Sequence, residues 1–142
     1  MTGAPNETNS PYPQPAGERW SVSEAKSNPI RDKSFQFALE VIKLNRMLTA
    51  DHEYVISKQL MRSGTAIGAL VEEATGAESR RDFLHKMSIA HKEAREVHYW
   101  LRLLDQSELI SGEDLTAYIS DADELVRLLT AITRSVKETT SK

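Results

Sequence analysis

Arginine and histidine recur at steps of three and four residues along one stretch of the chain, in a pattern that could hold phosphate. Arginine presents several N–H donors in a planar fork that matches phosphate oxygens. Glu93 and Glu96 lie on the same stretch, however, and a charged row is most often a solvated helix face. The candidate nucleic-acid contacts, which include two arginines that precede the row, are Arg80, Arg81, His91, Arg95, His98 and Arg102.

The sequence lacks the usual patterns of catalytic and metal sites. There is no cysteine, which excludes disulfides, thiolate metal ligands and cysteine nucleophiles. A di-metal bundle needs two Glu-x-x-His pairs, and no Glu stands three residues before a His here, although Asp82 and His85 have that spacing once. No nucleophile-elbow motif surrounds a serine. We therefore expect no catalytic residue, metal ligand or cofactor, and a small enzyme is the least favoured interpretation.

The charge balance excludes a global attraction to nucleic acid. Eighteen basic residues face 21 acidic ones, for a formal net charge of −3, so any such binding needs a local patch or an assembly. The chain does not open with a basic segment followed by an apolar run, as a signal peptide does. The most apolar stretch, 55–74, carries four charges and is not a membrane span. We expect a cytoplasmic protein without membrane association.

Helical periodicity supplies the elements that position these residues. All five prolines lie within the first 29 residues, which predicts a proline-rich, extended or disordered tail over 1–30. From residue 31 onward, apolar residues recur at steps of three and four over about 32–48, 52–74, 79–106 and 111–137. Because short connections make consecutive helices antiparallel, we predict an all-α domain, an antiparallel up-down-up-down four-helix bundle over 31–142.

The predicted helices have recognisable ends and apolar faces. Ser79 with Asp82, and Ser111 with Asp114, resemble capping boxes of the third and fourth helices. The first helix has a broad apolar face formed by Phe35, Ala38, Leu39, Val41, Ile42 and Leu48. The third has the most regular core stripe, formed by Phe83, Met87, Ala90, Ala94, Val97, Leu101 and Leu104.

A second row on the third helix lies about a quarter turn from its core stripe. An apolar row that points away from the core usually marks an interface. The alternative is a wide core stripe with Trp100 lying over its edge. The oligomer-interface candidates are Ile89, Glu93, Glu96, Trp100 and Leu103.

Two glycines, Gly64 and Gly68, lie inside the predicted second helix. Each should cost about 1 kcal/mol relative to alanine in a helix interior. The surrounding sequence, SGTAIG, lacks the Gly-Lys-Ser/Thr ending of a phosphate loop. We therefore expect the pair to let another helix approach closely, either in the same bundle or in the next subunit.

The segment 57–104 contains the motifs Gln59-Leu60, Ile67-Gly68-Ala69 and Tyr99-Trp100-Leu101. With them it resembles the small four-helix-bundle proteins first noticed as reading frames in intervening sequences of bacterial 23S rRNA genes. The segment KSFQFALEVIKL, 33–44, resembles the opening helix of that family, so the likeness spans 33–135. Leu70 replaces the asparagine expected in many relatives, and the tail is not part of the family core. The matching residues are Gln59-Leu60, Arg62-Ser63, Ile67-Gly68-Ala69, Glu73-Ala74, Asp82-Phe83, Lys86-Met87, Ala90, Lys92-Glu93-Ala94, Glu96 and Tyr99-Trp100-Leu101.

The resemblance implies a ring-like homopentamer without catalytic residues. A related branch contains accessory proteins of diversity-generating retroelements, whose basic pentamers bind nucleic acid and a reverse transcriptase. The acidic balance of this chain departs from that branch. We expect a binding or scaffolding factor with RNA or DNA as the favoured ligand class. The alternative is a protein–protein interaction adaptor that recruits another protein through the N-terminal tail and binds no nucleic acid.

Overall fold

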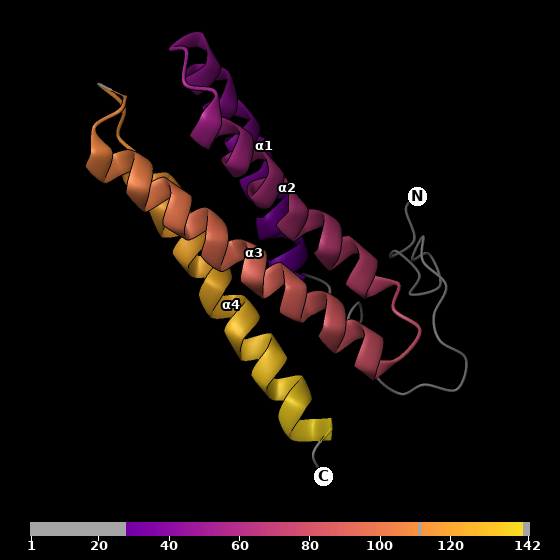
Figure 1. Cartoon of the computed structure of the whole chain (residues 1–142). Coiled ribbons are helices and arrows are strands. Elements are labelled where there is room, and N and C mark those ends of the chain that lie inside the picture. The colour runs from indigo at the N-terminus through magenta and orange to yellow at the C-terminus, as the bar shows by residue number, and fades with distance from the viewer. Residues whose placement is uncertain (1–27, 111, 141–142) are drawn as a thin grey trace, which may run out of the picture.

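A computed structural model describes residues 28–110 and 112–140 as four helices with no strand. They are α1 (Pro29–Ala50), α2 (Val55–Thr75), α3 (Arg80–Ser107) and α4 (Thr116–Thr140) (Figure 1). The first helix therefore begins slightly before the boundary expected at residue 31, and most of the predicted tail lies outside the described residues. Within those residues, no helix is both long enough and apolar enough to cross a membrane.

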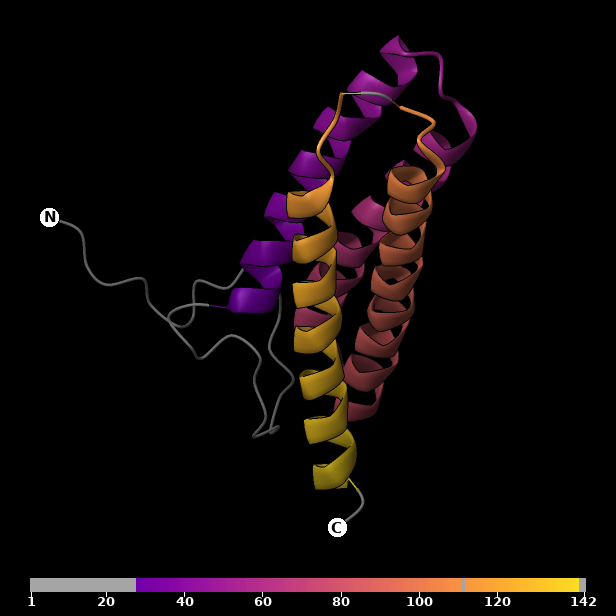
Figure 2. The same ribbon diagram turned by 90° about the vertical axis from the view of Figure 1, so that its left-hand side faces the viewer.

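The four helices pack as a bundle in which each helix contacts the next one along the chain. Figures 1 and 2 show the α1–α2 and α3–α4 connections at one end, and the end of α4 at the other. Helix α1 also contacts α4, but less extensively than the consecutive pairs contact each other, and the backbones of α1 and α3 do not approach closely. The boundary between α1 and α4 is thus the most open one in the bundle.

Short polar side chains cap three of the helices. The side chains of Asn28 and Ser79 accept hydrogen bonds from the backbone N–H groups of Arg31 (3.3 Å) and Asp82 (3.0 Å). At α4, Asp114 accepts one from the N–H of Thr116 (2.9 Å). The fourth helix therefore begins after Asp114, later than the expected start at Ser111, and Ser111 itself lies outside the described residues.

The core stripe was predicted correctly for α3 and only in part for α1, where Val41 and Leu48 are buried as expected. All seven predicted core residues of α3 are buried. On α1, Phe35 and Leu39 are instead 58% and 40% exposed. Apolar residues on this helix outnumber the positions of one inward stripe, so its periodicity is ambiguous. The stripe that faces the core is Ile30, Ser34, Phe37, Val41, Leu44 and Leu48.

Gly64 and Gly68 lie against α1 of the same chain. A Cβ atom added at Gly64 would lie 2.8 Å from Cγ2 of Val41, and one at Gly68 would lie 3.3 Å from the backbone oxygen of Ser34. The missing side chains let the backbone of α2 approach α1 closely. The contact is thus one between neighbouring helices of the bundle.

Candidate nucleic-acid interface

The row of arginines and histidines on α3 follows the boundary between α3 and α4. Nε2 of His91 lies 2.9 Å from Oγ1 of Thr130 on α4. At about 100° per residue, Arg80, Arg95, His98 and Arg102 all lie within about 40° of His91 around the helix. Arg81 lies roughly a quarter turn away and is exposed. We call this boundary the α3–α4 seam.

Helix α4 adds two cations to the seam that sequence reasoning missed. Arg134 and Lys137 lie four and seven residues after Thr130, and hence within about 40° of it around α4. Both are exposed. Their spacing was visible in the sequence, but only the contact of His91 with Thr130 shows that this edge of α4 faces the α3 row.

Most of the arginines on the seam form no ion pair with the part of the chain that the structure describes. Arg95, Arg102 and Arg134 are exposed, and none forms an ion pair with a carboxylate of residues 28–110 or 112–140. Arg127 differs, because its Nε lies 3.5 Å from Oδ2 of Asp123. Unpaired guanidinium groups at one boundary can bind an anion without first breaking an internal salt bridge.

His91 is half-buried in this basic environment. Its burial lowers the pKa of the imidazole, and the positive charges of Arg95 and Lys137 lower it further. The ring is therefore neutral at pH 7.

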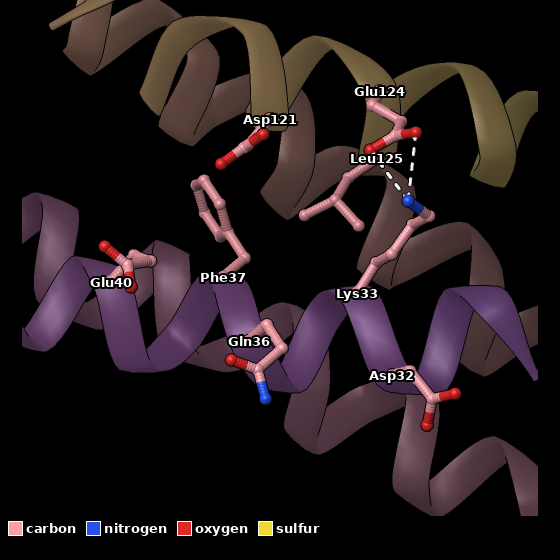
Figure 3. Close-up of a pocket in the computed structure, with 8 residues that line it drawn as sticks. All are labelled: Asp32, Lys33, Gln36, Phe37, Glu40, Asp121, Glu124 and Leu125. Atoms are coloured by element: carbon pink, nitrogen blue, oxygen red, sulfur yellow. Dashed lines mark hydrogen bonds and ion pairs between the residues drawn. The ribbon is translucent and has the colours of Figure 1, made fainter. Parts of the chain in front are cut away.

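Acidic residues lie at the opposite edge of α4, where it meets α1. A groove of about 290 Å³ opens there over the buried side chains of Phe37 and Leu125 (Figure 3). Among the described residues that line it, the one cation is Lys33, which pairs with Glu124 at 3.2 Å from Nζ to Oε2. The groove therefore keeps a negative balance that repels a polyanion and favours its approach at the seam. The remaining lining residues are Asp32, Gln36, Glu40 and Asp121.

Replacing Asp121 with asparagine is expected to stabilise the fold slightly at pH 7. Burial raises the pKa of this carboxyl, as do the charges of Glu124 and Glu40. The native state thus disfavours the carboxylate, so the stability that its protonated form contributes is lost as the pH rises through the raised pKa. The gain should be within about 0.5 kcal/mol, as is usual for surface positions.

Thermal unfolding at pH 7 and pH 3 tests this, because the gain should disappear once the carboxyl is protonated in both states. Asp123→Asn is the matched control: it removes a carboxylate that pairs with Arg127, so it should give no gain. An equal gain for Asp121→Asn at both pH values would contradict the electrostatic explanation.

The polar members of the predicted interface row have partners within the chain. The guanidinium of Arg62 on α2 donates to Oε2 of Glu93 at 2.9 Å from Nη1 and also pairs with Glu96. The indole N–H of Trp100 donates to Glu96 at 3.0 Å. This bond and Arg62 lower the pKa of Glu96. The row therefore lies along the α2–α3 boundary, with its charges balanced locally.

The apolar members of that row differ in exposure. Ile89 and Trp100 are half-buried, and Trp100 packs against the core. Leu103 is 39% exposed, and its neighbour Tyr99 is 49% exposed. The ring of Tyr99 meets that of Trp100 edge-on, with centroids 5.2 Å apart. The apolar surface available to a partner on α3 is thus formed mainly by Tyr99 and Leu103.

The described residues contain no cluster of three or more His, Asp or Glu side chains that could hold a metal ion.

Comparison with known proteins identifies the family. A family model described as 23S rRNA-intervening sequence protein matches residues 26–131. The chain belongs to this family. A solved structure from Bacteroides thetaiotaomicron, described as a protein of unknown function from the S23 ribosomal protein family, is 44% identical, with a TM-score of 0.70. The similarity covers 73% of this chain and 97% of that one. No protein with a curated description matches the sequence.

The family match includes the α3 half of the seam but not the two cations on α4. The row on α3 lies inside the part that matches the 23S rRNA-intervening sequence family, whereas Arg134 and Lys137 follow its last matched residue, 131. Chemically, the seam can bind anions and donate hydrogen bonds to them.

Proposed function

We propose that the chain is a non-enzymatic, homo-oligomeric binding factor that holds RNA or DNA along the α3–α4 seam. The observation that carries this proposal is the group of exposed arginines without an ion-pair partner among the described residues, Arg95, Arg102 and Arg134. The acidic α1–α4 groove at the other edge of α4 supports it, because it confines a polyanion to one side of the bundle.

The proposed assembly is a ring-like homopentamer of antiparallel up-down-up-down bundles. The connections at alternate ends support the helix directions. Two exposed apolar patches support the ring: Phe35 with Leu39 on α1, and Tyr99 with Leu103 on α3. When two different patches contact each other, the same contact repeats from subunit to subunit, and a suitable rotation between subunits closes them into a ring. A ring would repeat the seam in every subunit and so strengthen its field.

Replacing Arg95 and Arg134 together with glutamine is expected to weaken nucleic-acid binding and its salt dependence. Each lost phosphate contact to a single strand lowers the slope of log K against log salt by about 0.7, so the double variant should lose about 1.4. Fluorescence anisotropy with a labelled single-stranded RNA across a salt series measures this slope.

The matched control replaces Arg46 and Lys58 with glutamine. These cations of α1 and α2 are exposed, form no ion pair among the described residues and lie away from the seam. The same loss of slope in this control would show that binding follows net charge and not the seam. Absence of RNA and DNA binding by the unmodified chain at low salt would overturn the proposal.

The second candidate function is a protein-interaction adaptor, and the loop-bearing end of the bundle favours it. Four apolar residues near the α1–α2 and α3–α4 connections are exposed: Met47, Tyr54, Val55 and Leu109. An apolar surface of this kind suits a protein partner. Failure of the nucleic-acid test with retained assembly would favour this candidate.

A further inference from the structure

The hydrogen bonds around His91 leave one ring nitrogen available. The hydroxyl of Thr130 donates to the backbone oxygen of Val126 at 2.7 Å, which uses its single proton. In that arrangement Thr130 accepts from His91, so the neutral ring carries its proton on Nε2, 2.9 Å from the hydroxyl oxygen. Nδ1 then is an acceptor without a hydrogen-bond partner among the described residues. A further proton would be bound at Nδ1.

The charged groups that act on His91 are cations. They are Arg95 on α3 and Lys137 on α4, and Arg134 lies one turn along α4 from Thr130. No carboxylate of the described residues shifts the pKa of His91, and no charged group of α2 shifts it either. Without a ligand, a proton on Nδ1 would add a third positive charge to those of Arg95 and Lys137, which already disfavour it.

We propose that His91, Arg95 and Lys137 form a phosphate site that takes up one proton at Nδ1 of His91 when a phosphate binds. The single negative charge of a phosphate diester weakens the positive field of the two permanent cations, and a phosphate dianion offsets both of them. The protonated ring then offers an N–H donor at Nδ1 to a phosphate oxygen, in a charge-assisted hydrogen bond. The proton comes from solvent, and no covalent bond in the ligand changes. This inference rests on the proposed function, since it names the part of nucleic acid that the seam recognises.

Proton uptake makes the affinity depend on pH. With one proton bound per site, the association constant rises by up to about tenfold per pH unit between the pKa of His91 in the free protein and its higher pKa in the complex. Because the ligand raises the pKa of His91, binding is strongest below the pKa values of both the free protein and the complex. Above both values the contribution of the proton to binding is lost.

The direct test measures anisotropy of the labelled single-stranded RNA at pH 8, 7 and 6 with the full chain. The unmodified protein should bind more tightly at each lower pH. His91→Gln keeps a neutral side chain that can donate to Thr130 but removes the group that takes up the proton, so the rise in affinity from pH 8 to pH 6 should be lost. His52→Gln, in the turn between α1 and α2 and outside the seam, is the control and should keep the dependence. Equal pH dependence in His91→Gln and the unmodified protein would overturn the site.

A second measurement does not need nucleic acid. The ring resonances of His91, assigned by their loss in His91→Gln, are followed by NMR against pH with and without inorganic phosphate. The pKa of His91 should rise when phosphate is added, whereas the ring resonances of His52, in the turn between α1 and α2, should keep their positions at a fixed pH. An unchanged pKa for His91 overturns the phosphate site. A raised pKa without any RNA binding keeps the site but removes the proposed nucleic-acid function.

Discussion

Replacing Gly64 with alanine is expected to destabilise the bundle by about 1 kcal/mol, although the same change normally favours a helix. The added Cβ would lie 2.8 and 2.9 Å from the two methyl groups of Val41. Val41 is fully buried and its branched side chain has little rotamer freedom, so it cannot move aside. Overpacking of up to about 3 kcal/mol then outweighs the gain of about 1 kcal/mol in helix propensity.

Truncating the obstructing side chain should reverse the sign of this effect. In a Val41→Ala background the two methyl groups are absent and the nearest remaining atom is the Cβ of residue 41, at 3.2 Å, so Gly64→Ala should stabilise the protein by up to about 1 kcal/mol through helix propensity. The coupling energy between the two substitutions should therefore reach up to about 2 kcal/mol. Urea unfolding of the four variants at one protein concentration measures it, since assembly makes stability depend on concentration.

Gly68 provides a contrasting position on the same helix. Its added Cβ would lie 3.3 Å from the backbone oxygen of Ser34, which side-chain truncation cannot remove. Gly68→Ala should therefore show no rescue by Ser34→Ala. Equal coupling at both positions, or stabilisation by Gly64→Ala in the native background, would contradict the close contact with Val41.

The two glycines also show where sequence reasoning stops. Their spacing predicts a close approach by another helix, but it does not identify that helix. The sequence does not show which residue Gly64 faces. In the structure, the register of α1 places Val41 beside it. The same ambiguity explains Phe35 and Leu39: periodicity identifies an apolar helix, yet it does not choose among rival stripes when there are more apolar residues than inward positions.

The electrostatic surfaces were predictable to different degrees. The α3 row was visible because its members lie on one helix at regular steps. The contribution of Arg134 to the seam was not, because helix rotation about its own axis is set by packing. The acidic groove combines Glu40 with Asp121, which are far apart in sequence and meet only through the contact of α1 with α4. Arg62 is a similar case, since it pairs with two glutamates of the row expected at an interface.

Replacing Leu103 with aspartate is expected to reduce the assembly from the proposed pentamer to a monomer. The side chain is 39% exposed in the single chain, so the substitution should leave the bundle folded while placing a charge in the proposed contact. Trp100 is a poorer probe, because it packs on the core and bonds to Glu96. Light scattering should report a fall from five times the chain mass of 16.0 kDa to that mass.

Leu39→Asp should have the same effect from the other side of the contact, because it charges the α1 patch. Leu109→Asp, at an exposed position beyond the end of α3, is the matched control and should leave the mass unchanged. Circular dichroism of each variant separates loss of assembly from loss of fold. An unchanged mass in both Leu39→Asp and Leu103→Asp would place the interface elsewhere.

Mixing the two monomeric variants distinguishes a ring contact from a symmetric pair. If the α1 patch of one subunit contacts the α3 patch of the next, Leu39→Asp keeps an intact α3 patch and Leu103→Asp keeps an intact α1 patch. One sound contact can then form between them, and growth stops there, so the mixture should give a dimer of twice the chain mass. If each patch instead contacted its own copy, each variant alone would retain one sound contact and remain a dimer before mixing. A ring needs two different surfaces on every subunit, so a heterodimer that appears only on mixing is the outcome that a closed ring requires.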